Sequence, residues 1–303
     1  MQHVIDEDLE RYSKYLTRYR TCIVCGGGGN TTWARYGSYT AVKCPECGFI
    51  WINPFLNSKG LDEYYQDYIG MRFRDKVKTD QRAVQYEIDK AFLKLFALSG
   101  RVLDVGCSGG FFLAALGESF HRFGIDIDAQ AVKYARENYA FGPNVTCEAL
   151  EDSKYADGSF DVIIMRGVVE HLPDPEKAVE KAAVLLKHGG IFFVAATPDV
   201  SSFCADLYRE KWNQFHPVRH LTYFSLETLS RFLKRWRLDY IAHQHPYLET
   251  PYADLELDYM AVRQACVAKA AGHFDTIGRS RAFWGNMLNC VFRKTGEVHK
   301  LYG

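Results

Sequence analysis

The chain has 303 residues, of which 48% are hydrophobic and 24% are charged, so it holds enough apolar material for a full core and is not expected to be disordered. Its 37 Lys and Arg residues balance its 37 Asp and Glu residues, which gives no general reason to expect a nucleic acid or an anionic membrane as partner. No run of about 18 apolar residues predicts a membrane span. The N-terminus also lacks the apolar stretch of a secretory signal, so a cytoplasmic location is expected.

The N-terminal part of the chain predicts a small metal-binding module. Residues 1–20 alternate charged and aromatic side chains and predict a short helix, whereas residues 21–56 are rich in Cys, Gly, Thr and aromatics and predict a ribbon of strands and turns. Two Cys-x2-Cys pairs, eighteen residues apart, can place four thiolates tetrahedrally around one Zn²⁺, and two reversible disulfides are the alternative. The predicted zinc ligands are Cys22, Cys25, Cys44 and Cys47.

This zinc is expected to be structural. Four thiolates leave no open coordination position for a substrate. A piece of about 35 residues is also too small to be held together by burial alone, so ligation of the metal is expected to supply folding energy.

The next segment predicts a helix. Residues 79–98 carry apolar side chains at helical spacing (Val84, Ile88, Phe92 and Leu95) and are followed by Ser-Gly. We therefore expect residues 57–98 to form a helical linker between the zinc module at 1–56 and a larger domain at 99–303.

After Gly100 the pattern predicts a parallel sheet. Short apolar runs alternate with amphipathic stretches, which is typical of βαβ units. Past Pro198 we expect a helix capped by Ser225, a sixth strand at 237–244, a helical insertion at about 250–280 and a last strand near 285–296. The prediction is an α/β fold with a Rossmann-like, doubly wound sheet of seven strands, and its first five strands are RVLDV, FGIDI, NVTCE, FDVIIM and IFFVAA.

The most informative segment is Val102-Leu-Asp-Val-Gly-Cys-Ser-Gly-Gly110, which lies where the first strand ends and the first helix begins. A glycine-rich turn at that point lets the backbone approach a ligand closely. Asp126 follows Asp104 by 22 residues, at the end of the second strand, where a carboxylate can accept hydrogen bonds from ribose hydroxyls. The turn departs from the dinucleotide pattern, because Asp104 precedes the first glycine.

At this point the sequence resembles the class I S-adenosylmethionine-dependent methyltransferases. The resemblance covers about residues 85–240 and is carried by LDVGCSGGFFLAAL, FGIDIDAQAVKYAREN, ALEDSKYADGSFDVIIMRGVVEHLPDPEKAV and LLKHGGIFFVAATPD. It departs from the family at Ser108, where glycine is usual, and a serine is small enough to keep the cofactor interpretation.

The resemblance implies S-adenosylmethionine as cofactor and assigns the residues around it. Asp104 would lie near the amino group of the cofactor, Asp126 would bind the ribose, and Arg166 with Gly167 would face the sulfonium. The remaining cofactor contacts would be backbone at Gly106, Cys107 and Gly110 along the methionine moiety, and Ile127, Leu150 and Glu151 around the adenine.

The N-terminal module resembles zinc modules attached to bacterial methyltransferases of sugar and natural-product biosynthesis. This resemblance implies O- or C-methylation of a small-molecule acceptor. A base is needed only for a hydroxyl or a carbon acid, and segment 211–225 follows the fifth strand, at the edge of the sheet where ligands bind. It supplies the candidate catalytic residues His220, His216 and Tyr223, for which lining or structural roles are the alternative.

Two other functions remain open. An RNA methyltransferase would use the zinc ribbon to grip nucleic acid, although no Lys- or Arg-rich tract marks such a surface. A non-catalytic scaffold would bind the cofactor only structurally, although the acidic and glycine positions of the turn are intact.

Overall fold

The computed structural model describes residues 10–72 and 76–298, and the chain packs into two compact units. The first unit contains residues 1–72, 198–229 and 245–287, and the second contains residues 73–197, 230–244 and 288–303. The predicted division at residues 56 and 98 stays a prediction.

The second unit contains a seven-stranded sheet with strand order β12-β13-β10-β9-β6-β7-β8, which confirms the predicted core. Strands β10, β9, β6, β7 and β8 run parallel, and β12 and β13 pair antiparallel. The first five predicted strands are all present, and the apolar runs of β9 and β10 are buried, as is expected for strands covered on both faces. The bounds are β6 Gly100–Val105, β7 Phe120–Asp126, β8 Val145–Cys147, β9 Phe160–Arg166, β10 Leu186–Pro198, β12 Leu238–Gln244 and β13 Met287–Lys294.

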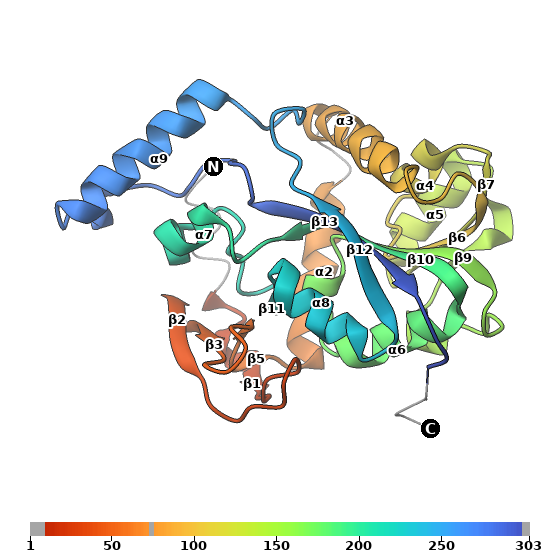
Figure 1. Ribbon diagram of the computed structural model, residues 1–303, viewed down its shortest axis with the longest axis horizontal. Coiled ribbons are helices and arrows are strands. Elements are labelled where there is room, and N and C mark those ends of the chain that lie inside the picture. The colour runs from red at the N-terminus through yellow and green to blue at the C-terminus, as the bar shows by residue number, and fades with distance from the viewer. Residues whose placement is uncertain (1–9, 73–75, 299–303) are drawn as a thin grey trace. The chain divides into compact units, whose positions relative to one another are not determined.

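Helices cover the two faces of this sheet, with α3 on the other side from α6 (Figure 1). Apolar side chains of α3, α4 and α5 pack with Val102, Ile164 and Phe193 in one core. Polar caps begin the helices: the Asp128 carboxylate accepts the N–H of Gln130 at α5, and the Ser225 hydroxyl accepts the N–H of Thr228 at α8, as predicted. The bounds are α3 Lys76–Leu93, α4 Phe111–Leu116, α5 Ala129–Asn138, α6 Pro175–Leu185 and α8 Leu226–Lys234.

The helix predicted for residues 79–98 is present as α3, but it ends at Leu93. Of the apolar residues at helical spacing, Phe92 is buried, whereas Val84 is 46% exposed and Leu95, beyond the end of the helix, is 74% exposed. The face that points inward carries Gln85 and Asp89, followed by Phe92 and Leu93. A hydrophobic-periodicity argument cannot find a face on which two polar residues are buried.

The first unit is built on a four-stranded sheet with order β11-β4-β3-β2. The ribbon of strands and turns predicted for residues 21–56 is present, and it gains a fourth strand from a remote segment, because Thr222 and Tyr223 of β11 pair with Trp51 and Ile50 of β4. The bounds are β2 Thr31–Tyr36, β3 Tyr39–Lys43, β4 Ile50–Ile52, β11 Thr222–Tyr223, α2 Ser58–Arg72 and α7 Phe203–Tyr208.

The helix predicted for residues 1–20 is wrong from Ser13 onward. Leu16–Arg18 forms strand β1, which pairs with β5 (Phe55–Leu56), and Ser13–Tyr15 is a single 3₁₀ turn. Residues 1–9 of that prediction lie outside the described residues. The Tyr12 ring packs at the edge of Tyr64 in the core of the unit, so this segment is held by tertiary packing.

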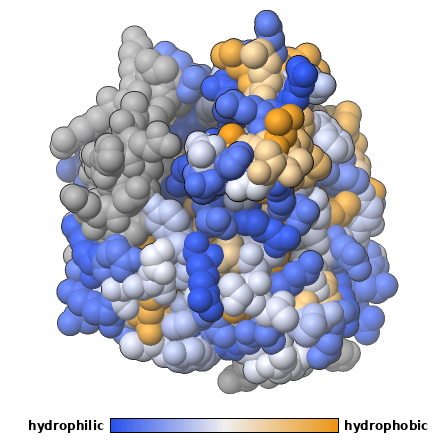
Figure 2. Space-filling model, turned by 90° about the vertical axis from the view of Figure 1, so that its left-hand side faces the viewer, coloured by the Kyte–Doolittle hydropathy of each residue, from blue (hydrophilic) through white to orange (hydrophobic). Residues whose placement is uncertain are grey.

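The insertion predicted near the C-terminus contains one long helix, α9 (Leu255–Ala270), and a 3₁₀ turn at Phe274–Thr276. Five large apolar side chains of α9 are at least half exposed: Leu255, Leu257, Tyr259, Met260 and Val267. Figure 2 looks at the side on which α9 lies in Figure 1 and shows apolar residues gathered near the top of that face. Among the described residues, no helix is both long and apolar enough to span a membrane.

Candidate functional site

The glycine-rich turn follows β6 at the carboxyl edge of the sheet. Gly106 and Gly110 have φ of 71° and 75°, and Ser108 adopts the same left-handed region with φ of 50°. The N–H groups of Gly106 and Cys107 donate to the Ile125 carbonyl at 2.8 and 3.0 Å, which ties the turn to β7. A Cβ on Gly106 would come within 2.7 Å of Val168 Cγ2, so glycine is required both for conformation and for space.

Asp126 ends β7 and faces this turn. Its Oδ2 accepts the Ser108 N–H at 2.7 Å and its Oδ1 accepts the Asp128 N–H at 2.9 Å. These two backbone donors fix the orientation of the carboxylate at the end of β7. The next side chain, Ile127, is 67% exposed, which leaves an apolar surface where the adenine is expected.

Asp104 is a buried carboxyl group, 2% exposed, and among the described residues it has no hydrogen-bond partner. Burial raises its pKa to about 8, Arg166 lowers the pKa, and Asp126 raises it further. A carboxyl group in this state is poised to gain a cationic ligand. The fixed Asp126, the exposed Ile127 and this buried acid together fit S-adenosylmethionine.

Arg166, at the end of β9, is held by residues that the sequence analysis missed. Its Nε donates to Asp89 Oδ2 at 2.8 Å, and the guanidinium lies over the Tyr86 ring at 4.5 Å. Asp89 Oδ1 accepts from Gln85 at 2.9 Å and from Asn289 at 2.7 Å. The sequence signal for this network is Asp89, an acidic residue within the predicted amphipathic helix, because a carboxylate that is buried there needs a cation as partner.

The other predicted cofactor residues lie in the same unit. Gly167 has φ of 61° and its N–H donates to the Ala195 carbonyl at 2.8 Å. Leu150 is buried and begins a 3₁₀ turn after β8, whereas Glu151 is exposed. The roles of all ten predicted cofactor residues stay predictions.

The predicted catalytic residues lie together in the first unit. The His216 and His220 ring centroids are 5.3 Å apart, and His220 Nδ1 is 2.9 Å from the Gln214 carbonyl oxygen. Tyr223 is 1% exposed, and its hydroxyl oxygen accepts the backbone N–H of His216 at 3.2 Å. Their catalytic roles stay predictions, and these contacts also suit the structural alternative.

The four predicted zinc ligands come together in the first unit. Cys22 Sγ is 3.4 Å from Cys47 Sγ, and Cys25 Sγ is 3.5 Å from both Cys22 and Cys44. These separations are far longer than a disulfide bond, and they approach the roughly 3.8 Å expected between sulfurs tetrahedrally bound to Zn²⁺. The cluster is consistent with a zinc site and not with the disulfide alternative.

Backbone geometry forms the two knuckles. The Gly26 N–H donates to the Cys22 carbonyl at 2.8 Å, and the Gly48 N–H donates to the Cys44 carbonyl at 3.0 Å. Both glycines have positive φ, of 77° and 78°, which closes each turn after its second cysteine. All four sulfurs lie within 4.8 Å of one another, so the residues fit a structural metal.

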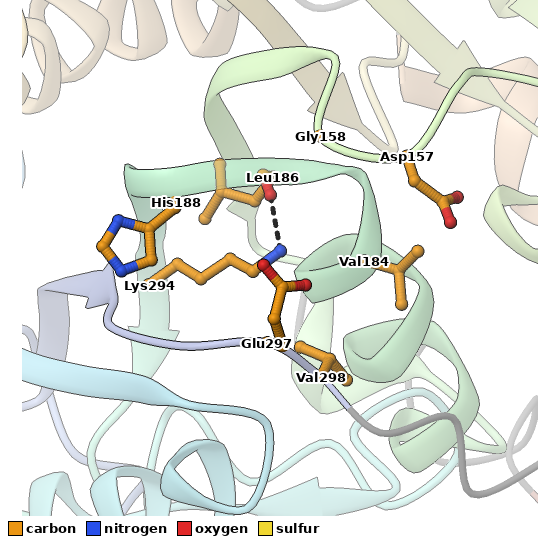
Figure 3. Close-up of a pocket in the computed structure, with 8 residues that line it drawn as sticks. All are labelled: Asp157, Gly158, Val184, Leu186, His188, Lys294, Glu297 and Val298. Atoms are coloured by element: carbon orange, nitrogen blue, oxygen red, sulfur yellow. Dashed lines mark hydrogen bonds between the residues drawn. The ribbon is translucent and has the colours of Figure 1, made fainter.

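A pocket of about 270 Å³ lies elsewhere in the second unit (Figure 3). It is lined by Gly158, Leu186 and Lys294, among others, and so sits at the amino ends of β9 and β10. Lys294 Nζ donates to the Leu186 carbonyl at 2.7 Å, as the dashed line in Figure 3 shows. Burial lowers the pKa of Lys294, while Glu297 and Asp157 raise it. This pocket is at the opposite edge of the sheet from the glycine-rich turn.

A family model described as a methyltransferase domain matches residues 79–243. Ubiquinone biosynthesis O-methyltransferase from Thiobacillus denitrificans is 38% identical over 109 residues, which are 34% of this chain and 47% of that protein. The chain therefore spans about half the length of the curated relatives that it matches first.

Solved structures agree at the level of the fold. A S-adenosylmethionine-dependent methyltransferase from Thermotoga maritima has a TM-score of 0.52 and 18% identity, covering 75% of this chain and 99% of its own. The 1,6-didemethyltoxoflavin-N1-methyltransferase of Burkholderia thailandensis has a TM-score of 0.52 and 15% identity, covering 84% of this chain and 97% of its own.

Replacing Asp126 tests the ribose assignment. Asp126→Ala removes one or two charge-assisted hydrogen bonds of roughly 1.5–3 kcal/mol each, so S-adenosylhomocysteine is expected to bind at least about 10-fold more weakly in calorimetry. Asp128→Ala, which removes only a helix cap, is the control and should keep the parent affinity. Equal affinity of Asp126→Ala and the parent contradicts the assignment.

The raised pKa of Asp104 predicts two effects of pH. The folded carboxyl binds a proton up to about pH 8 and the unfolded one only to about pH 3.9, so this group makes the ligand-free protein less stable as pH rises across that window. In Asp104→Asn, the unfolding temperature should therefore depend less on pH across this window.

An ammonium group beside Asp104 favours its charged form, so binding of S-adenosylmethionine at pH 7 should release close to one proton, as measured by calorimetry in buffers of different ionisation enthalpy. If the unfolding temperature of Asp104→Asn depends on pH as it does in the parent, the raised pKa of Asp104 is contradicted.

Removing one thiolate tests the metal centre. The purified protein should contain one zinc per chain by elemental analysis, and Cys44→Ser should lose the metal and unfold at lower temperature, because ligation supplies folding energy. Cys204→Ser, at a buried cysteine of the same unit outside the cluster, is the control for thiol loss. Full zinc content in Cys44→Ser rules out the proposed ligand set.

Proposed function

The chain belongs to the methyltransferase domain family, and we propose that it transfers a methyl group from S-adenosylmethionine to a small-molecule acceptor, at oxygen or carbon. The observation that carries this proposal is the buried, unpaired Asp104 carboxyl beside the glycine-rich turn. The cofactor supplies an electrophilic methyl group on a sulfonium. The rest of the chemistry consists of holding the two reactants in line and, for a hydroxyl or a carbon acid, removing a proton.

The residues around the turn divide the binding of the cofactor among them. Asp104 accepts from the ammonium, and Asp126 accepts from the ribose hydroxyls with its orientation fixed by two backbone N–H groups. Arg166 was predicted to face the sulfonium, but its contact with Asp89 and its effect on the pKa of Asp104 favour a different partner. We propose that its terminal nitrogens, which have no hydrogen-bond partner among the described residues, bind the carboxylate of the methionine moiety.

The acceptor is proposed from charge and from the relatives. Lys and Arg balance Asp and Glu in the chain, so a polyanionic acceptor has no general attraction to it. One matched curated relative is named as an O-methyltransferase of ubiquinone biosynthesis, and one solved structure is titled as an N1-methyltransferase with bound 1,6-didemethyltoxoflavin. Both names point to small-molecule acceptors, which supports the same class here.

The zinc module is proposed to be structural in this function. Its four thiolates leave the metal no open position. The knuckles flank a sheet whose core contains Trp33 and Tyr39, and this core is shared with Tyr223 of β11. We propose that the metal keeps this sheet folded, and with it the segment that carries His216 and His220.

Methyl transfer into two classes of acceptor tests the proposal. With labelled S-adenosylmethionine, label should enter the small-molecule fraction of a cell extract at both low and high salt, because a neutral acceptor in a pocket depends little on counterions. An RNA acceptor would instead show affinity falling with salt at a slope of about −0.7 per phosphate contact. Label that enters only RNA, with strong inhibition by salt, overturns the proposal and favours the RNA methyltransferase.

A further inference from the structure

The carboxylate of Asp89 divides its two oxygens between different kinds of donor. Oδ1 accepts the side-chain amides of Gln85 at 2.9 Å and Asn289 at 2.7 Å, whereas Oδ2 accepts Arg166 Nε at 2.8 Å. The Asp89 side chain has no exposed surface, so water does not compete for either oxygen. Because the amides occupy Oδ1, the carboxylate binds the guanidinium through one oxygen and not through the two parallel bonds that such a pair can form.

Two aromatic rings help to hold the guanidinium of Arg166 in place. Its Cζ lies 4.5 Å from the centre of the Tyr86 ring and 5.7 Å from the centre of the Phe112 ring. An arginine that is fixed at Nε and supported by rings has lost much of its rotamer freedom before a ligand arrives, which favours binding. Its terminal nitrogens have no hydrogen-bond partner among the described residues, and its side chain is 17% exposed, so they remain open to a ligand.

The strand register brings this guanidinium near Asp104. Strands β6 and β9 are parallel, and Asp104 lies opposite Ile164. Arg166 is two residues beyond Ile164, so its side chain is on the same face of the sheet as that of Asp104. The two charges are close enough to interact, because Arg166 lowers the pKa of Asp104. The carboxyl edge of the sheet therefore presents an acid and a guanidinium on neighbouring strands.

An acid and a guanidinium placed in this way match an amino-acid zwitterion. The methionine part of S-adenosylmethionine carries an ammonium and a carboxylate on one carbon atom, so the ammonium can meet Asp104 while the carboxylate meets Arg166. An analogue without the carboxylate would bring only its ammonium to this pair. It would displace water from the guanidinium without supplying an anion in return, and its binding would be weaker.

We propose that Asp89 is a positioning residue: it holds Arg166 by Nε so that the terminal nitrogens bind the carboxylate of the cofactor, and the site thereby rejects analogues that lack this carboxylate. The inference rests on the proposed function, which assigns Arg166 to the carboxylate. It adds that the selectivity is set by helix α3, which carries Asp89 together with Gln85 and Tyr86, without any contact between Asp89 and the cofactor.

Three ligands measure this selectivity by calorimetry, and none of them requires the methyl acceptor. S-adenosylhomocysteine carries both charges, S-adenosyl-3-thiopropylamine carries the ammonium alone, and methylthioadenosine carries neither. Charge-assisted hydrogen bonds from a fixed guanidinium should make the parent protein bind the first ligand at least about 10-fold more tightly than the second. Methylthioadenosine reports on the adenosine part of the site.

Arg166→Lys separates the two tasks of the arginine. A lysine keeps the positive charge and can pair with Asp89, so the unfolding temperature should stay near that of the parent. Its one nitrogen is then used by Asp89, which leaves no further donor group in a fixed geometry for the ligand. The preference for S-adenosylhomocysteine over S-adenosyl-3-thiopropylamine should therefore fall toward equal affinity, while the affinity for methylthioadenosine is unchanged.

Asp89→Asn distinguishes positioning from neutralisation of charge. The one oxygen of the new amide is drawn to the two donors Gln85 and Asn289, which turns its NH₂ group, a donor, toward Arg166 Nε. The guanidinium then loses its anchor, and the preference for the carboxylate should fall. If Asp89 only neutralised Arg166, removal of its charge would strengthen the attraction for a ligand carboxylate, and the preference would rise.

Asp161→Asn is the matched control. This carboxylate lies at the other end of β9, where it accepts Lys187 Nζ at 2.7 Å and the backbone N–H of Arg101 at 2.8 Å. The variant removes an ion pair of the same sheet far from the glycine-rich turn, so it should keep the parent preference among the three ligands.

The outcomes separate this inference from the proposed function. A parent preference that persists in Arg166→Lys, or that is unchanged or larger in Asp89→Asn, overturns the inference while the proposed function stands. An equal loss of affinity for all three ligands in Asp89→Asn indicates general damage to the site and also overturns the positioning role. A parent protein that binds neither S-adenosylhomocysteine nor S-adenosylmethionine overturns the proposed function itself.

Discussion

The second unit depends on the ion pair between Asp89 and Arg166. A carboxylate with no exposed surface is costly to bury, and here it is offset by three donors, Arg166, Gln85 and Asn289. Those donors come from α3, β9 and β13, and the Asn289 side chain also accepts the N–H of Ala196 at 2.8 Å near the end of β10. One buried acid therefore joins the carboxyl ends of β9 and β10, the amino end of β13 and the helix α3, which is the part of the sheet that must keep its shape around a cofactor.

Much of the fold could be predicted from the sequence, because its signals are local. Buried parallel strands are continuous apolar runs, and the turn requires glycines because the backbone has positive φ at those positions. The polar network on α3 could not be predicted, since Gln85 and Asp89 break the apolar stripe and their partners lie up to 200 residues away. The strand at Leu16–Arg18 was missed for the same reason, because its only cue is its pairing with Phe55 and Leu56.

The candidate sites also divide into those that short sequence motifs indicate and those that only the folded structure brings together. The cysteine ligands and the carboxylates of the turn lie within short motifs, so spacing alone brought them to notice. Asp89 and Arg166 are 77 residues apart and belong to no common motif, and only the packing of α3 beside β9 brings them together.

Because β11 pairs with β4, the sheet of the zinc module includes a strand from a distant part of the chain. Thr222 and Tyr223 complete a sheet whose other three strands lie within residues 31–52, so the module relies on chain that is made some 170 residues later. During synthesis the knuckles can bind metal well before their sheet is complete. Until the distant strand has been made, Ile50 and Trp51 lie on an unpaired edge of the sheet. A fragment that contained the cysteines without β11 would thus bind metal but leave an unpaired strand edge, which can pair with other chains. Such a module is poorly suited to exchange between proteins as a separate part.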